Sequence, residues 1–426
     1  MNRPTSLLIA LACCANTFAQ QFELDWAEPI GAASRKIKVA SNGDVVSLSY
    51  TWGDPFELRR MTPGGATIWT ITWPEPSQAN VDMDMDGNDN IYLHFGFNGQ
   101  LDLDPGPDST VIGSGHAYAK YDGGGQFIWG FGITGAFIAS DENTSAISCD
   151  DAGNLYVIGT MSGPGTIDLD PGAGVEDFTM GQFIQVSYVA RYLPDGTFSW
   201  GVAYVGAFQG DGILTRDVAA LRDGSGFFLL YRFANSCLPF DADLGPGTYI
   251  TGACEHHLLR YDSTLQFVAY GGVYYLLGRL ACDAAGSAYV NGLPPSSNHT
   301  TTSKYVQNGT AMDLVYDAHH EIGNAEYGDV VADEQGGCFA AYSIWDQFSG
   351  SLRAVHVDPV GTIDLDLSLP KGANNSDTRC AAIALDGGHL YIGTSVAYNA
   401  VDYDPGPGTM IFAFAAAGFA TFTVAH

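Results

Sequence analysis

Short apolar runs separated by Asp-Gly turns recur along the whole chain. Each unit has an apolar strand, an Asp and a Gly, and then a second strand rich in apolar and aromatic residues. Alternating apolar positions bounded by Gly, Asp and Pro are typical of β-strands joined by tight turns. The seven copies occupy residues 38–50, 81–95, 146–160, 218–231, 280–293, 330–343 and 382–395.

A second hairpin follows the copies and ends in an aromatic outer strand, as in residues 57–73, 116–133 and 187–204, and more weakly in 256–272, 302–318 and 352–368. The units therefore hold four antiparallel strands. Their spacing varies between 44 residues (Gly43 to Gly87) and 73 residues (Gly153 to Gly226). Four-stranded units at such a period, with no helical pattern between them, predict an all-β fold, a seven-bladed β-propeller of four-stranded antiparallel blades.

The two ends of the chain complement each other. The last unit, residues 382–426, stops after its third strand, whereas residues 21–32 align with the outer strands at 126–136 and 197–207. Closing a ring of blades removes open sheet edges that would otherwise pair with other molecules. We expect residues 20–426 to form one propeller domain in which the N-terminal strand 21–32 completes blade seven.

The first 19 residues have the pattern of a secretory signal peptide, with an early cation, an apolar run and small residues before Gln20. No later apolar stretch is long enough for a membrane span. The sequence predicts an exported protein located outside the cell or on its surface. Cys13 and Cys14 leave lipid anchoring as an alternative.

Three motifs resemble a known family, the secreted bacterial β-propeller repeats called SBBP repeats, which are common in the Bacteroidetes. They are D-x-x-G-N-x-Y-V-x-G at 150–159, D-x-D-P-G at 102–106, 168–172 and 402–406, and K-Y-D-x-x-G-x-F-x-W at 120–129. The resemblance covers nearly the whole chain after residue 19, and implies a secreted or surface-exposed propeller.

Composition excludes several classes of function. The 426 residues are 46% apolar, which supports a packed core, and carry 17 Lys and Arg against 47 Asp and Glu, for a net charge of −30. A nucleic-acid binder would need the opposite sign, so no nucleic-acid partner is expected.

Spaced acidic pairs lie between the second and third strands of four units. In a propeller this connection faces the side where ligands usually dock. Two carboxylates and a Pro-Gly turn can offer oxygens to calcium, but a pair supplies too few of its ligands, and Asp-Pro-Gly is equally typical of a turn. Both interpretations stay open for Asp102, Asp104, Asp168, Asp170, Asp241, Asp243, Asp402 and Asp404.

A second candidate for a cation is the segment 82–90, which places Asp82, Asp84 and Asp86 at alternate positions. Position 12 of the calcium loop it resembles is Leu93, so the bidentate Glu is missing. The repeat alignment also places Asp82 and Asp84 in an innermost strand, and these residues need not form a free loop.

Six cysteines follow the predicted signal peptide. Cys237 and Cys254 flank a hairpin connection, where antiparallel pairing would bring them within disulfide distance. Buried free thiols are expected for Cys149, Cys282, Cys338 and Cys380. The paired histidines at 256–257 and 319–320 have no metal-protease spacing and are interpreted as ordinary strand residues.

No short catalytic motif is present, and the outer Trp69, Trp129 and Trp200 are expected to pack between blades. We expect a monomeric, non-catalytic binding or surface-scaffold propeller that takes a protein or glycan at its loop face, with calcium as its one candidate cofactor. The alternative is a glycosidase or polysaccharide lyase with its site in the central channel, since propellers assemble sites from residues scattered over blades.

Overall fold

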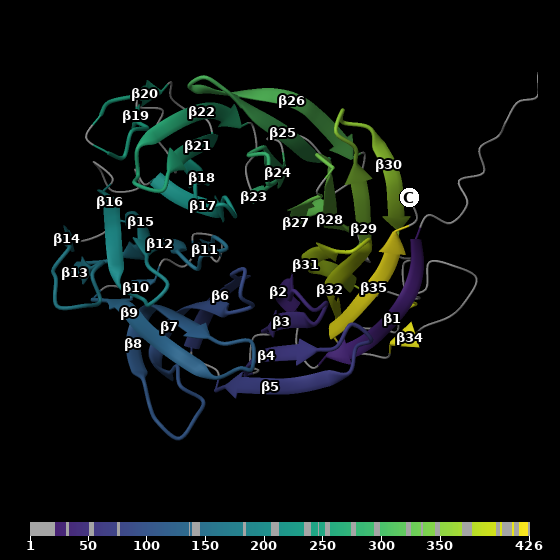
Figure 1. Ribbon diagram of the computed structural model, residues 1–426, viewed down its shortest axis with the longest axis horizontal. Coiled ribbons are helices and arrows are strands. Elements are labelled where there is room, and N and C mark those ends of the chain that lie inside the picture. Colours follow the sequence, from purple (N-terminus) through teal and green to yellow (C-terminus); the bar gives the residue numbers. More distant parts are fainter. Residues whose placement is uncertain are drawn as a thin grey trace, which may run out of the picture.

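The computed structural model describes β-strands and their connections over most of the chain. It describes residues 22–30, 34–50, 55–74, 77–135, 137–138, 145–181, 185–205, 213–233, 240–245, 247–251, 256–273, 278–293, 299–320, 325–333, 335–345, 350–368, 377–397, 401–402, 411–412 and 417–424. Every regular element in these ranges is a strand. They form a propeller-like ring of antiparallel sheets around a central channel (Figure 1).

The first part of the ring consists of three separate sheets. Two have four strands in sequence order, and the third has four strands with the short β10 added beside β12. The strands of the first two sheets are β2 (Ser34–Val39), β3 (Val45–Ser49), β4 (Phe56–Met61) and β5 (Thr67–Trp73), then β6 (Ser77–Met85), β7 (Ile91–Asp102), β8 (Val111–Tyr121) and β9 (Phe127–Thr134). Those of the third are β10 (Phe137–Ile138), β11 (Ala146–Cys149), β12 (Leu155–Ser162), β15 (Gln185–Tyr192) and β16 (Phe198–Val205).

The rest of the ring differs from seven separate sheets, because it forms two eight-stranded sheets. One contains β17 (Ile213–Ala220), β18 (Gly226–Phe233), β21 (His256–Asp262), β22 (Phe267–Val273), β23 (Gly278–Cys282), β24 (Ala288–Gly292), β25 (Thr300–Asn308) and β26 (Ala311–His320). The other contains β27 (Ala325–Ala332), β28 (Cys338–Trp345), β29 (Gly350–Val357), β30 (Ile363–Ser368), β31 (Asp377–Asp386), β32 (His389–Ala397), β35 (Ala417–Val424) and β1 (Phe22–Ile30).

Each eight-stranded sheet is two antiparallel groups of four joined at one point. A single parallel residue pair, Tyr270 with Ala311, joins β22 to β26, and another, Gly350 with Asp377, joins β29 to β31. At the first junction two outer strands touch, because an edge strand has unpaired backbone groups on its outer side. At the second, the start of β29 touches the inner strand β31. Three short ribbons project from the ring: β13 (Gly165–Asp168) with β14 (Asp177–Met180), β19 (Phe240–Asp241) with β20 (Ile250–Thr251), and β33 (Val401–Asp402) with β34 (Ile411–Phe412).

The strand β1 lies beside β35 at the end of the second eight-stranded sheet. The two pair antiparallel from Phe22 with Val424 to Ile30 with Ala417, and β35 pairs on its other side with β32. Segments from the two ends of the chain thus share one sheet (Figure 1).

The innermost strands β2, β6, β11, β17, β23, β27 and β31 follow one another around the channel in chain order, and β31 contacts β2 (Figure 1). Most of them end in a tight turn closed by two backbone bonds, such as the bonds from the Ala40 amide to the Asp44 carbonyl and from the Gly43 amide to the Ala40 carbonyl. Gly43 in this turn has φ +82°, a conformation that glycine adopts without strain.

Apolar cores lie between neighbouring four-stranded groups, including the two groups of one eight-stranded sheet. One core joins Leu48 and Leu58 of the first sheet to Leu93 and Phe95 of the second, all fully buried. Burial of such side chains is the main favourable contribution that holds the sheets together.

The outer-strand tryptophans pack against the apolar cores, and their indoles also form hydrogen bonds to the following group, which the sequence did not predict. The indole of Trp69 donates to the Gly123 carbonyl at 3.3 Å, and that of Trp129 donates to the Pro194 carbonyl at 3.1 Å. The indole of Trp200 donates to the Ser263 carbonyl at 3.0 Å. Each acceptor lies in a turn of the following four-stranded group.

Two lysines also link neighbouring four-stranded groups. Lys120 lies 4.8 Å from the ring centre of Tyr92 and donates to the Pro194 carbonyl at 3.1 Å. Lys304 similarly lies over Tyr289 and donates to the Gly336 carbonyl. A cation over an aromatic face stabilises by about 0.5–2 kcal/mol.

Candidate functional site: the central channel and the acidic loops

The acidic pairs adopt one geometry in three copies. Asp102, Asp168 and Asp241 each end a strand, and the Oδ1 of each accepts the amide two residues on at 2.9–3.1 Å and the amide eight residues on at 2.7–2.8 Å. The second carboxylates of these pairs, Asp104, Asp170 and Asp243, each accept the amide of the Gly two residues on. Of the fourth pair, Asp402 lies in β33 and Asp404 lies outside the described residues.

A tyrosine fastens each of these loops. The hydroxyl groups of Tyr121, Tyr192 and Tyr261 donate to the carbonyl of the residue between the two acids, which is Leu103, Leu169 or Ala242. Each loop is therefore an ordered turn in which the Asp Oδ1 atoms accept the backbone amides. In the sequence, this hydrogen bond is indicated by the tyrosine that lies two positions before the turn between the third and fourth strands.

The cysteines with described side chains are thiols. Cys149, Cys282 and Cys338 form no disulfide. Burial raises the pKa of Cys282 and Cys338 to about 12, so both stay protonated. Cys237 and Cys254 lie outside the described residues, and so does the side chain of Cys380.

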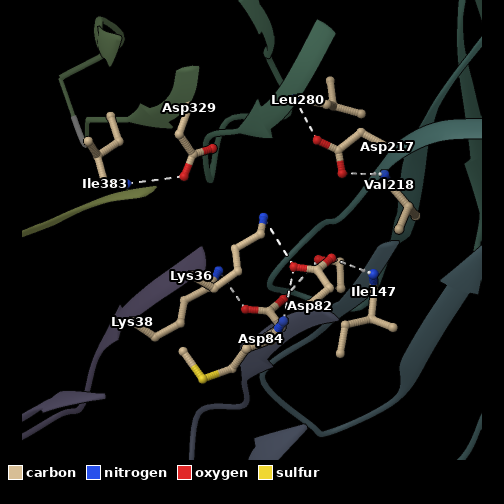
Figure 2. A network of polar contacts seen from close by, with 12 residues as sticks. Lys36, Lys38, Asp82, Asp84, Ile147, Asp217, Val218, Leu280, Asp329 and Ile383 are labelled. Carbon is tan, nitrogen blue, oxygen red and sulfur yellow. Dashed lines mark hydrogen bonds and ion pairs between the residues drawn. The ribbon is translucent and has the colours of Figure 1, made fainter. Parts of the chain in front are cut away.

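Asp82 and Asp84 lie in the inner strand β6, where the repeat alignment placed them, and both point into the channel (Figure 2). The Oδ2 of Asp82 accepts the Ile147 amide at 2.9 Å, and the Oδ2 of Asp84 accepts the Cys149 amide at 2.8 Å. Both acceptor bonds reach the neighbouring inner strand β11. Asp86 lies in the turn that follows and accepts the Asn88 and Asn90 amides.

Two more inner strands carry an Asp that accepts an amide of the neighbouring inner strand. The Oδ2 of Asp217 on β17 accepts the Leu280 amide of β23 at 2.9 Å, and the Oδ2 of Asp329 on β27 accepts the Ile383 amide of β31 at 3.1 Å (Figure 2). In every case the Oδ1 accepts the amide of the next residue in its own strand. These carboxylates thus tie the inner strands β6, β17 and β27 to the inner strands that follow them, β11, β23 and β31.

Two lysines of β2 extend toward these acids. Lys36 Nζ lies 3.3 Å from Asp82 Oδ1, and Lys38 Nζ lies 2.6 Å from Asp84 Oδ1 (Figure 2). Burial alone would lower the pKa of Lys36, but the nearby Asp82, Asp329 and Asp217 outweigh it and raise that pKa. Burial would raise the pKa of Asp84, but Lys38 and Arg222 lower it well below its ordinary value. Lys36 and Asp84 are therefore held in their charged forms.

A cavity of about 320 Å³ occupies the channel. Its lining runs from the middle of the inner strands, at Lys36, Asp217 and Asp329, to their ends and the turns that follow, at Asp386 and Arg222. Among the described residues, no group of three or more His, Cys, Asp or Glu side chains is arranged to hold a metal ion. No helix in the same ranges is long and apolar enough to cross a membrane.

Sequence reasoning missed a buried imidazole pair on β7 and β8. His94 and His116 are almost fully buried, their rings stack at 5.1 Å, and His94 Nε2 lies 2.8 Å from His116 Nδ1. The paired histidines at 256–257 and 319–320 lie in β21 and β26. His257 and His320 are buried, and His320 Nε2 lies 2.8 Å from the Thr302 hydroxyl oxygen.

Comparisons with known proteins give no family. No family model matches the chain, and no curated protein sequence matches it. Solved structures resemble it at low identity. The polysaccharide lyase Uly1 has 11% identity, a TM-score of 0.49, and coverage of 97% of this chain and 94% of that one. A PL25 ulvan lyase has 12% identity, a TM-score of 0.46, and coverage of 86% and 93%. A subtype N10 neuraminidase-like protein of A/little yellow-shouldered bat/Guatemala/060/2010 has 10% identity, a TM-score of 0.40, and coverage of 94% and 98%.

Proposed function

We propose that this protein is an exported, non-catalytic binding or surface-scaffold propeller of the SBBP-repeat kind, with seven blades. The blade count is supported by the seven inner strands that surround the channel in chain order, and by the single residue pairs that join each eight-stranded sheet. The three sequence motifs support the family, and the pattern of residues 1–19 supports export.

The observation that carries the proposal is the use of the channel carboxylates. A glycosidase needs a free carboxyl pair about 5–10 Å apart, one as acid and one as base or nucleophile. Here Asp82, Asp84, Asp217 and Asp329 each accept two backbone amides with both oxygens, and the first two also pair with lysines. These carboxylates hold inner strands together, and ligand binding is left to the loop face.

Incubation with soluble polysaccharides tests this proposal. We expect some glycans or proteins to be retained in affinity electrophoresis, and no new reducing ends or unsaturated uronate products after prolonged incubation. Release of either product would make the protein an enzyme and overturn the proposal. Retention of no ligand, with no product, would favour the scaffold role over the binding role.

Calcium at the paired carboxylates is the subsidiary part of the proposal. It is supported by the Oδ2 atoms of Asp102, Asp168 and Asp241, which accept no hydrogen bond in the described part of the chain. We expect residues 20–426 to melt at a higher temperature in calcium than in chelator. Calcium at 100 times its Kd adds about 2.7 kcal/mol per site.

The matched variant changes Asp102, Asp104, Asp168 and Asp170 to Asn. Asparagine keeps the Oδ1 acceptor that the turn uses and replaces Oδ2 by an amide, so the turns should survive while the calcium response is lost. If the calcium and chelator curves of both proteins coincide, the loops are turns only.

A further inference from the structure

Each inner strand has an equivalent residue just before its turn, which we call the edge residue. The residue after it forms the backbone bond that closes the hairpin, as the Ala40 amide does with the Asp44 carbonyl. Bonded and non-bonded pairs alternate along an antiparallel ladder, so the amide and the carbonyl of every edge residue point away from the hairpin, toward the channel. The seven edge residues, of which all but Cys149 line the channel cavity, are Val39, Met85, Cys149, Ala220, Cys282, Ala332 and Leu385.

Side chains satisfy the edge amides of three consecutive inner strands, β6, β11 and β17. The carboxylate of Asp84 accepts the Met85 amide at 2.9 Å and, on the next strand, the Cys149 amide at 2.8 Å. The hydroxyl of Ser148 accepts the Ala220 amide of the strand after that at 3.0 Å. The residue before the edge residue thus caps the edge amide of its own strand, of the next strand, or of both.

The edge carbonyls of the same three strands are also satisfied. Arg222 Nη1 donates to the Met85 carbonyl at 2.9 Å and to the Cys149 carbonyl at 3.1 Å. The thiol of Cys282 donates to the Ala220 carbonyl at 3.3 Å. No backbone group of these three edge residues is left for a ligand.

The other four edge residues are open on both groups. Among the described residues, the amides and carbonyls of Val39, Cys282, Ala332 and Leu385 form no hydrogen bond. The sequence explains the difference, because the side chains that would reach these amides have no polar atom: they belong to Ala219, Ala281, Val331 and Ala384. Backbone groups inside a protein are almost always satisfied by protein, by water or by a ligand. Eight such groups face this cavity from one side.

The open groups select the chemistry of a ligand. Each open edge residue offers one donor and one acceptor, and a hydroxyl group can accept and donate at once. The four strands surround one side of the channel, so a ligand needs hydroxyls that point in several directions, as they do around a sugar ring. A charged ligand gains less, because the channel carboxylates already accept backbone amides and the net charge of −30 repels anions.

We propose that the channel cavity binds a neutral polyhydroxylated molecule of monosaccharide size. Its hydroxyl groups bond to the four open edge residues, and its C–H groups lie against the side chains of Ala281, Val331 and Ala384. The cavity volume of about 320 Å³ is at the small end of ligand cavities and suits a single sugar ring. The site is separate from the loop face and does not rest on the proposed function.

Calorimetry and thermal melts with D-glucose, D-galactose, D-mannose and D-xylose test the proposal. We expect at least one of these sugars to bind saturably and to raise the melting temperature. Tetrahydropyran, which has the same ring without hydroxyls, and the anion D-glucuronate should do neither. Hydrogen exchange then locates the site, because the bound sugar should slow exchange at the four open edge amides. Binding at the loop face would instead slow exchange in residues 102–110, 168–176 and 241–249.

One variant closes the site in the way that β6 is closed. Ala281→Asp places a carboxylate where β6 has Asp84, so it should cap the amides of Cys282 and Ala332 and weaken binding at least about tenfold. The matched control is Ala285→Asp, which adds the same charge at an exposed position in the turn of the same hairpin. This control should bind the sugar like the parent.

A second variant guards against a folding defect in the first. Val331→Asn adds no charge, and its Oδ1 can take the Ala332 amide as Asp84 takes the Met85 amide, so it should also weaken binding. The proposal is overturned if none of the four sugars binds the parent, since water then satisfies the open groups. It is equally overturned if tetrahydropyran or glucuronate binds as tightly as the sugar, if exchange slows only in the loops, or if either folded variant binds like the parent.

Discussion

Removal of residues 20–32 should lower the melting temperature by about 10 °C or more and promote aggregation. The deletion takes away β1, which pairs with β35 along its whole length. Each lost backbone bond contributes about 0.5–1.5 kcal/mol net, so the loss amounts to several kcal/mol. It also leaves β35 as an open edge, and an unpaired edge strand is a template for association with other chains. Differential scanning calorimetry and light scattering measure both effects.

The control for this deletion is a chain that begins at residue 20. It lacks only the predicted signal peptide and keeps β1, so it should melt cooperatively and stay monomeric. A chain that begins at residue 33 and melts at the same temperature as this control would show that β1 does not close the ring.

Strand positions could be predicted from the sequence because each unit carries its own local signals. The alternation of apolar residues and the Asp-Gly turns depends on neighbours in the chain, and it located the inner hairpins and placed Asp82 and Asp84 in an inner strand. The way the sheets join could not be predicted. It depends on single contacts such as Tyr270 with Ala311, where two outer strands approach each other in space.

The interactions between charged residues across the channel and the imidazole pair were missed for a similar reason. Lys36 and Asp329 are far apart in the chain and act on each other only because their strands surround one channel. A signal was present, since the residue four positions before each inner turn is charged in five units. His94 and His116 lie on adjacent strands with no motif around them, and only the register of β7 with β8 brings them together.

The second large effect that we expect is a loss of folding stability in acid, caused by the buried histidines. Burial lowers the pKa of His116 to about 4, and burial with the neighbouring His116 lowers the pKa of His94 well below its ordinary 6.5. A histidine whose folded pKa is depressed contributes fully above the unfolded value of about 6.5. Its contribution falls as pH decreases toward the folded value, because the unfolded chain takes up the proton first.

Stability should therefore fall between pH 6.5 and 4. His116 alone loses about 2 kcal/mol by pH 5 and about 3 kcal/mol below pH 4, since a tenfold difference in proton affinity between the folded and unfolded chain is worth about 1.4 kcal/mol. His94 adds a further loss in the same range. Asp84, whose pKa is lowered, loses its contribution only below its unfolded value of about 3.8, so the histidines dominate above pH 4.5. Urea unfolding at pH 7.5, 6, 5 and 4.5 measures the slope.

His356 provides a control that distinguishes the effect of the buried histidines from a general sensitivity to acid. Its ring lies 2.7 Å from Asp333 Oδ2 and 2.6 Å from Asp364 Oδ1. Burial would lower its pKa, but the two carboxylates raise it above 6.5. Its contribution is complete below pH 6.5 and is lost as pH rises through the folded pKa. Replacement of His94 and His116 by Gln should reduce the fall in stability between pH 6.5 and 4.5 without abolishing it, because burial also lowers the pKa of His257 and the pKa of His320 to about 4. His356→Gln should lower stability over this range without changing the slope, because the contribution of His356 is already complete below pH 6.5. An unchanged slope in the His94 and His116 variant would mean that other groups control the acid response.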